Sequence, residues 1–249
     1  MADRNYPHAP ITEAVIDVQV EFGSEPNNST FSAVAETLSG QFPIVAPIHF
    51  MEINVTGATD QSPSHFKSSQ LEVGLRLSSE KGDRVLQLQR RGFTYSHLPP
   101  YTSWDTFCRE ARALWDVFST KLAPTVATRV AVRYINRIEI LEERFELEKY
   151  FLLYPKLPEG IPQDISSCFM QIVMPQPDIS GNASATLTFA AEPNPRPGAT
   201  AFLLDFDVFS TCRVSPGSEE IWDTLALLRS RKNKLFEACI TDATRERFQ

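Results

Sequence analysis

Residues 13–22 read Glu-Ala-Val-Ile-Asp-Val-Gln-Val-Glu-Phe, and apolar side chains occupy every second position from Ala14 to Phe22. A period of two places successive side chains on opposite faces of a strand, so this stretch predicts a strand with one buried face. Residues 129–138, Arg-Val-Ala-Val-Arg-Tyr-Ile-Asn-Arg-Ile, show a related alternation in the second half of the chain. The correspondence between the two stretches is the first indication of an internal repeat.

The elements predicted around these two strands follow the same order in both halves. A short helix is predicted at residues 30–38 in the first half and at residues 145–151 in the second. Three strands and a long helix come next in each half. The long helices are predicted over Trp104–Leu122 and from Ser218 through Ala243 toward the C-terminus. The remaining strands are predicted at residues 49–55, 71–78, 85–95, 168–174, 185–190 and 201–209.

This order predicts an α+β fold built from an internally duplicated β-α-β-β-β-α unit. The two repeats would span residues 1–125 and 126–249 and would join into one continuous globular unit. Residues 86–89 (Leu-Gln-Leu-Gln) resemble residues 204–207 (Leu-Asp-Phe-Asp), which supports the same division. The expected result is one curved antiparallel sheet with both long helices on one face.

The composition is that of a globular chain with a moderate negative charge. Lys and Arg number 24 against 31 Asp and Glu, which gives a formal net charge of −7 over 249 residues. No apolar run approaches the roughly 20 residues of a membrane-spanning helix, and residues 1–7 lack the apolar stretch of a secretory signal. The four cysteines lie far apart and form no Cys-x-x-Cys pair. These features predict a cytoplasmic protein with reduced cysteines and no membrane association.

The sequence lacks the common motifs for catalysis and cofactor binding. It contains no Gly-x-Gly-x-x-Gly fingerprint, no Walker-type loop and no Gly-x-Ser-x-Gly nucleophile motif. The four histidines show no metal-ligand spacing, and His97, which precedes two prolines, is predicted to lie in a loop. We therefore assign no catalytic residue, no metal ligand and no cofactor from the sequence.

Arginines recur at every fourth position of the strand predicted at residues 128–140, so they share one of its faces. They are Arg129, Arg133 and Arg137. Guanidinium groups suit the recognition of phosphate or carboxylate, and they equally suit ion pairs with acidic residues of the protein. The acidic residues at matching positions of the first strand are Glu13, Asp17 and Glu21. If the two strands pair antiparallel about a pseudo-twofold axis, Asp17 is expected to face Arg133.

Other polar residues on apolar elements are candidates for a binding site. Asp205 and Asp207 alternate with apolar residues, a spacing that fits either a cation or ion pairs with arginines. Asn233, Glu237 and Thr241 lie four apart and would form a polar stripe on the last helix, with partners expected from Arg91 or from the strand of the two aspartates. The candidate ligand-binding residues are Arg91, Arg133, Asn136, Asp205, Asp207, Asn233 and Glu237.

Three segments carry a resemblance: residues 87–95 (QLQRRGFTY), 133–138 (RYINRI) and 232–242 (KNKLFEACITD). Together with residues 9–17 and 203–209, they make the chain similar to a sporadically distributed family of uncharacterised bacterial proteins of about this length. The resemblance covers nearly the whole chain and implies a single bacterial cytoplasmic protein without implying an activity. Gly92 departs from the family pattern, which has an acidic or polar residue there. A ligand contact at that position would be altered in this chain.

The leading functional hypothesis is a non-catalytic binding module. Its ligand would be a protein partner or a small anion, held in the concavity between the sheet and the helices. The alternative is a nucleic-acid-binding module that uses the arginine strand and a basic C-terminal helix, although the net negative charge argues against it. A hydrolase without a recognisable motif is the third hypothesis. The basic residues of that helix are Arg229, Arg231, Lys232, Lys234, Arg245 and Arg247.

Overall fold

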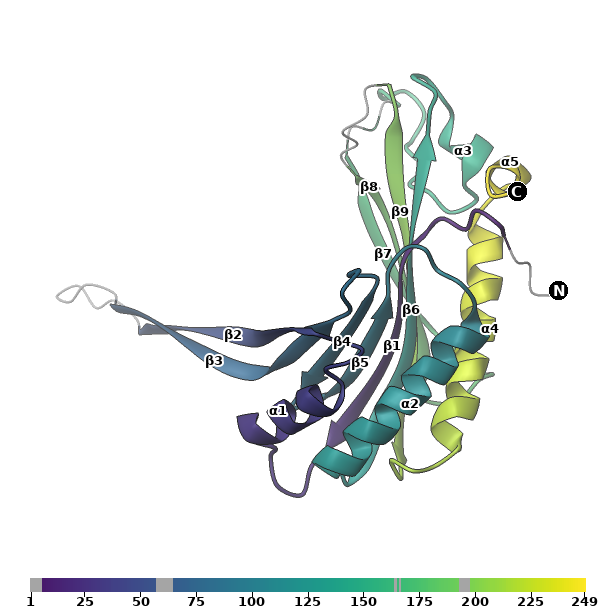
Figure 1. Ribbon diagram of the computed structural model, residues 1–249. Helices are drawn as coiled ribbons and strands as arrows, with labels where there is room; N and C mark the ends of the chain where they lie inside the picture. Colours follow the sequence, from purple (N-terminus) through teal and green to yellow (C-terminus); the bar gives the residue numbers. More distant parts are fainter. Residues whose placement is uncertain (1–5, 57–64, 164, 166, 193–197) are drawn as a thin grey trace.

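The computed structural model describes residues 6–56, 65–163, 165, 167–192 and 198–249. The described residues form nine strands and five helices, and all nine strands join into one sheet (Figure 1). Neighbouring strands pair antiparallel, in the order β2-β3-β4-β5-β1-β6-β9-β8-β7. The predicted α+β class with one large antiparallel sheet is confirmed.

The two halves of the chain lie on either side of the central pair of strands, β1 and β6. The elements of the first half are β1 (Ile11–Glu21), α1 (Asn28–Thr37), β2 (Ile44–Thr56), β3 (His65–Ser78), β4 (Arg84–Gln89), β5 (Gly92–His97) and α2 (Trp104–Leu122). Those of the second half are β6 (Val126–Ile140), α3 (Leu147–Tyr150), β7 (Phe169–Pro175), β8 (Ala183–Glu192), β9 (Thr200–Val214), α4 (Glu220–Cys239) and α5 (Asp242–Glu246).

The single strand predicted at residues 85–95 is a hairpin of two strands, β4 and β5, which turns at Arg90 and Arg91. The fully buried apolar residues are the even-numbered Leu86 and Leu88 before the turn and the odd-numbered Phe93 and Tyr95 after it. The prediction was wrong because the turn has two arginines in place of the glycine or asparagine that usually identifies a two-residue hairpin loop. His97 consequently ends a buried strand and does not lie in the predicted loop.

This hairpin also affects the comparison of the two halves. β5 lies beside β1 in the first half, and β9 lies beside β6 in the second. Residues 86–89 belong to β4 and residues 204–207 to β9, so these similar segments do not occupy equivalent places in the sheet. The described strands also differ in number between the halves. The internal duplication stays a prediction.

The last helix is shorter than the sequence predicts. α4 ends at Cys239, and Ile240 adopts an extended conformation and pairs with Phe151. The Thr241 hydroxyl then accepts a hydrogen bond from the backbone N–H of Thr244 and caps α5. The prediction of one continuous helix was wrong because this capping threonine starts a new helix. Thr241 therefore does not extend the polar stripe of α4.

The three longer helices, α1, α2 and α4, cover one face of the sheet (Figure 1). α2 and α4 lie side by side and are joined by two contacts. Trp115 Nε1–H of α2 donates to the Pro216 carbonyl just before α4 at 2.9 Å, and the Arg229 guanidinium of α4 lies 5.7 Å from the Trp104 ring centroid of α2. The even-numbered residues of β1, from Ala14 to Val20, face these helices and are buried. No helix in the described part of the chain is long and apolar enough to cross a membrane.

The opposite face, which we call the open face, carries two glycines in one row of the sheet. Gly74 in β3 and Gly92 in β5 both pair with Gln89 of β4. A Cβ atom at Gly74 would lie 2.0 Å from the Leu88 carbonyl oxygen, and one at Gly92 would lie 2.3 Å from that of Val18. Only glycine permits such close approach of neighbouring backbones. β3 leaves β4 at this row and continues with β2 as the two-stranded arm of Figure 1.

Candidate functional site

A cavity of about 610 Å³ lies on the helix-covered side of the sheet. Four parts of the chain line it: residues 6–11 before β1, residues 99–105 before and at the start of α2, the middle of β6, and the C-terminal half of α4. Three of the candidate residues from the sequence, Asn136, Asn233 and Glu237, line this cavity. We call it the α4 cavity.

One face of α4 supplies the polar wall of the α4 cavity. The lining residues Arg229, Lys232, Asn233, Phe236 and Glu237 follow helical spacings of three and four, so they lie on the same side of the helix. This spacing brings the predicted polar stripe, Asn233 and Glu237, and two of the basic residues of the helix to one site. Lys234 also lines the cavity.

Lys232 occupies a position that the core pattern assigns to an apolar residue. It continues the buried series of Leu225 and Leu228, and only 8% of it is exposed. Its Nζ lies 3.8 Å from the centroid of the Tyr134 ring, which offsets part of the cost of removing an ammonium group from water. A lysine this buried in a protein is almost always paired with another group.

Two tyrosines meet at the aromatic wall of the cavity. The hydroxyl oxygens of Tyr101 and Tyr134 lie 3.0 Å apart. Burial raises the pKa of the Tyr134 phenol well above its usual value, and burial also raises that of Tyr101. Both phenols therefore keep their protons at neutral pH. Because one hydrogen bond between them uses one proton, the second hydroxyl proton remains available for donation.

Asn136 presents a hydrogen-bond acceptor at the same wall. Its side chain is 3% exposed, and its Nδ2 donates to the carbonyl oxygens of Tyr134 at 3.3 Å and Leu204 at 3.0 Å. These two bonds fix the orientation of the amide. The Oδ1 atom of Asn136 is thus the group left to accept a hydrogen bond from an occupant of the cavity.

Glu237 adds little negative charge to the cavity because it has a cationic partner. Its carboxylate accepts hydrogen bonds from the Tyr6 hydroxyl at 2.8 Å and from the Arg245 Nε at 2.9 Å. The sequence predicts partners for Glu237 from Arg91 or from the strand of Asp205 and Asp207, and that prediction was wrong. Among the described lining residues, Asp105 supplies the other carboxylate, whereas Arg229, Lys232 and Lys234 supply cations.

Arg133, Asp205 and Asp207 lie on the open face, separated from the cavity by the sheet itself. The Arg133 Nε donates to Asp205 Oδ1 at 2.9 Å. The Arg129 guanidinium donates to Asp17 Oδ1 at 2.8 Å and to Asp207 Oδ2 at 2.9 Å. Asp17 therefore pairs with Arg129, and the predicted pairing of Asp17 with Arg133 was wrong. The strand register places Val15, in place of Asp17, opposite Arg133.

Arg91, the remaining candidate, is far from both groups in the fold. It lies in the β4–β5 turn with its side chain exposed, and its carbonyl oxygen accepts a hydrogen bond from the Val20 backbone N–H at 2.8 Å. The structure does not bring Arg91 together with the other candidates.

Most arginines of the proposed nucleic-acid surface already have partners within the protein. Arg137 donates to Glu192 at 2.7 Å, Arg231 contacts Asp178 and Gln176, and Arg245 bonds Glu237. Arg129 and Arg133 are held by the three aspartates of the open face. A phosphate backbone would have to compete with these carboxylates for each guanidinium.

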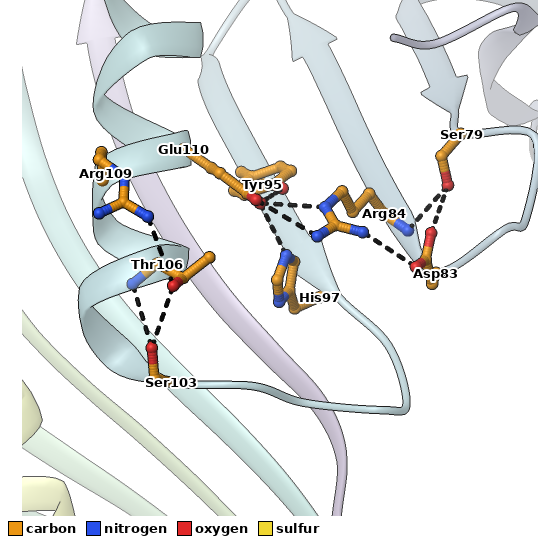
Figure 2. Close-up of polar contacts among 9 residues, drawn as sticks. All are labelled: Ser79, Asp83, Arg84, Tyr95, His97, Ser103, Thr106, Arg109 and Glu110. Atoms are coloured by element: carbon orange, nitrogen blue, oxygen red, sulfur yellow. Dashed lines mark hydrogen bonds and ion pairs between the residues drawn. The ribbon is translucent and has the colours of Figure 1, made fainter.

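A second polar cluster joins α2 to the β4–β5 hairpin (Figure 2). The Glu110 carboxylate of α2 accepts hydrogen bonds from Arg84 Nε at 3.0 Å and the Tyr95 hydroxyl at 2.7 Å, and its Oε2 lies 2.9 Å from His97 Nε2. Partial burial alone would raise the pKa of Glu110, but hydrogen bonds from Arg84, Tyr95 and His97 outweigh it and lower that pKa to about 2. Of the described buried side-chain polar atoms, His97 Nδ1 is one of two without a hydrogen bond. The cavity does not reach this cluster.

Glu110→Gln should lower the free energy of unfolding by about 1–2 kcal/mol at pH 7. The lowered pKa means that the folded protein favours the ionised carboxylate, and partial solvent screening reduces the effect. This contribution is present above the unfolded pKa near 4.5 and disappears as the pH falls toward 2. Denaturant unfolding at pH 7 and pH 3 should show a smaller difference from the unsubstituted protein at pH 3. Glu36→Gln, at an exposed position of α1, is the matched control, and equal losses in both variants would contradict a specific role for Glu110.

No group of three or more His, Cys, Asp and Glu side chains in the described ranges is placed to hold a metal ion. The chain was also compared with known proteins. No protein-family model matches it, and no curated protein matches it in sequence.

Proposed function

We propose that the protein is a non-catalytic binding module that holds a small anionic ligand in the α4 cavity. Lys232 carries the proposal, because its ammonium group is held at a core position with only 8% exposure and lines the cavity on the same face of α4 as Arg229. Arg229 and Lys234 line the same space, so an anion there would meet more than one cation.

The cavity supports a small ligand better than a macromolecular one. Its volume lies within the range of about 300–1,000 Å³ that is typical of small-molecule sites. The nucleic-acid alternative is less well supported, because the arginines on which it relied are paired inside the protein. The cytoplasmic location and the membership of the bacterial family remain parts of this proposal.

The proposal predicts that inorganic phosphate raises the melting temperature at constant ionic strength, set with sodium chloride. Lys232→Met keeps the aliphatic stem and removes the charge, so it should weaken phosphate binding at least tenfold. A lost hydrogen bond to a charged group is worth about 1.5–3 kcal/mol. Arg229→Gln should weaken binding in the same direction and provides a second variant if Lys232→Met fails to fold.

Lys81→Met is the control, because Lys81 is exposed in the turn between β3 and β4. It should respond to phosphate as the unsubstituted protein does. The same melting shift in Lys232→Met, Arg229→Gln and Lys81→Met would refute an anion site at α4. The absence of any shift beyond the sodium chloride control would refute phosphate-like anions as ligands.

A further inference from the structure

The α4 cavity places each of two cations against an aromatic ring. The Lys232 Nζ lies over the Tyr134 ring, and the Arg229 guanidinium lies 5.7 Å from the centroid of the Trp104 ring. Trp104 and Tyr101 are both half-buried and line the cavity. The positive groups are therefore next to flat aromatic surfaces on which a planar ligand group could stack.

The cavity is larger than an inorganic anion needs. A lone phosphate ion would leave most of the 610 Å³ filled by water, whereas a ligand with a second, larger group would use the aromatic wall. Tyrosine, tryptophan and proline side chains make up much of that wall, including Pro7, Pro10, Pro99 and Pro100. These residues suit an uncharged planar group better than a second charge.

The polar atoms of the wall set requirements for that planar group. Asn136 Oδ1 can accept one hydrogen bond, because its Nδ2 is already used by two backbone carbonyls. The Tyr101–Tyr134 pair retains one hydroxyl proton to donate. A matching ligand therefore carries a donor and an acceptor on its planar group as well as an anionic group.

We infer, on the basis of the proposed function, that the ligand of the α4 cavity is a nucleoside phosphate. Its phosphate would bind to Arg229 and Lys232, and its base would stack on Trp104. The base edge would donate to Asn136 and accept from the tyrosine pair. A nucleobase edge presents the required combination, a donor beside a ring-nitrogen or carbonyl acceptor.

This mode of recognition explains why the sequence shows no nucleotide motif. Glycine-rich nucleotide-binding loops hold phosphate with backbone N–H groups at the start of a helix. Here the cations are side chains on the inner face of α4, so neither glycine spacing nor a helix N-terminus is required. The residues involved come from four separate parts of the chain.

Calorimetric titration of the full chain with adenosine 5′-monophosphate and ribose 5-phosphate tests the inference. Adenosine monophosphate should bind about tenfold or more tightly than ribose 5-phosphate, because only the former can stack. Trp104→Leu should abolish that difference, measured as the ratio of the two affinities in the same variant, so that an effect of the lost Arg229–Trp104 contact on both ligands cancels. Trp104→Phe, which keeps an aromatic ring, should retain much of it. Cooperative thermal unfolding of each variant confirms that the fold is intact.

The outcomes separate this inference from the proposed function. Equal affinity for the two compounds would overturn the nucleoside phosphate and leave an anion site in place. A preference for adenosine monophosphate that persists in Trp104→Leu would overturn the assigned stacking wall. If neither compound binds and phosphate gives no melting shift, both the inference and the proposed function fail.

Discussion

Gly92→Ala should destabilise the protein by about 3–5 kcal/mol and lower its melting temperature by about 10 °C or more. Gly92 has φ +156°, a conformation that residues with a Cβ rarely adopt. The added Cβ would also lie 2.3 Å from the Val18 carbonyl oxygen and 2.9 Å from the Gln19 Cα. Both atoms belong to the backbone of β1, so relief requires that β5 and β1 separate at the centre of the sheet.

Gly40→Ala is the matched control, because no atom lies within 4 Å of a Cβ at that position. It should leave the melting temperature nearly unchanged or raise it slightly, since alanine restricts the unfolded chain. A Gly92→Ala protein that melts within a degree or two of the unsubstituted protein would contradict the close approach of β1 and β5. Gly92 is also buried, so the close approach of the β1 backbone is by itself sufficient to require glycine at this position.

Arg129→Met should lower the free energy of unfolding by about 3 kcal/mol at pH 7. One guanidinium bridges Asp17 of β1 and Asp207 of β9, and it also lies 4.4 Å from the Phe209 ring centroid. Methionine would fill part of the space but would leave two half-buried carboxylates without their cation. Removing one partner of a buried ion pair typically costs about 3–5 kcal/mol, and the residual exposure of these groups favours the lower value.

The loss in Arg129→Met should shrink as the pH is lowered. Burial raises the pKa of Asp17 and that of Asp207 above the usual value of 3.8, and Arg129 opposes that rise. Without the guanidinium, both pKa values rise further. A carboxyl group with a raised folded-state pKa stabilises the fold when protonated, and this contribution is lost as the pH rises through that pKa. Acid should therefore restore part of the stability of the variant.

Urea unfolding at pH 7 and pH 4.5 measures this dependence. Arg213→Met is the control, because Arg213 makes an exposed ion pair with Glu21 at 3.2 Å and should change stability by less than about 1 kcal/mol. A loss in Arg129→Met that stays constant between the two pH values would show that the two aspartates do not depend on this arginine.

Two of the longer elements of this protein follow closely from local sequence patterns. The predicted helix Trp104–Leu122 has the same bounds as α2, and the strand predicted from residue 128 to 140 differs from β6 by two residues at its start. Both elements carry a long, uninterrupted apolar period, which is the strongest signal of secondary structure. The β4–β5 hairpin has no such signal at its turn, because Arg90 and Arg91 are not typical turn residues.

The candidate site was only partly accessible to sequence reasoning. Asn136, Asn233 and Glu237 were chosen as polar residues on otherwise apolar elements, and they do line one cavity. Lys232 was noted only as part of a basic bias, although it interrupts the apolar series of α4 and could have been singled out on that ground. Tyr101 and Trp104 lie at the entry to α2 and have no pattern that connects them to α4.

Alternation in β1 and β6 was enough to assign each side chain to a face of the sheet, but it was insufficient to assign its partner. A shift of two residues between paired strands keeps every side chain on the same face, so the apolar pattern does not distinguish Asp17–Arg133 from the pairing that forms. In the structure, the register brings Arg129 between Asp17 and Asp207. That choice depends on bulges, turns and packing across the whole sheet.

The assembly of the α4 cavity also depends on the packing of distant elements. Local patterns place polar groups on β6 and α4 separately, because each pattern depends on neighbours a few residues away along the chain. Whether Lys232 lies over Tyr134, and whether Asp205 lies on the same side of the sheet as Glu237, depends on how distant elements pack. The sheet separates Arg133, Asp205 and Asp207 from Asn136, Asn233 and Glu237. The odd spacing of Arg133 and Asn136 in β6 already places these two on opposite faces, but only tertiary packing decides which face α4 covers.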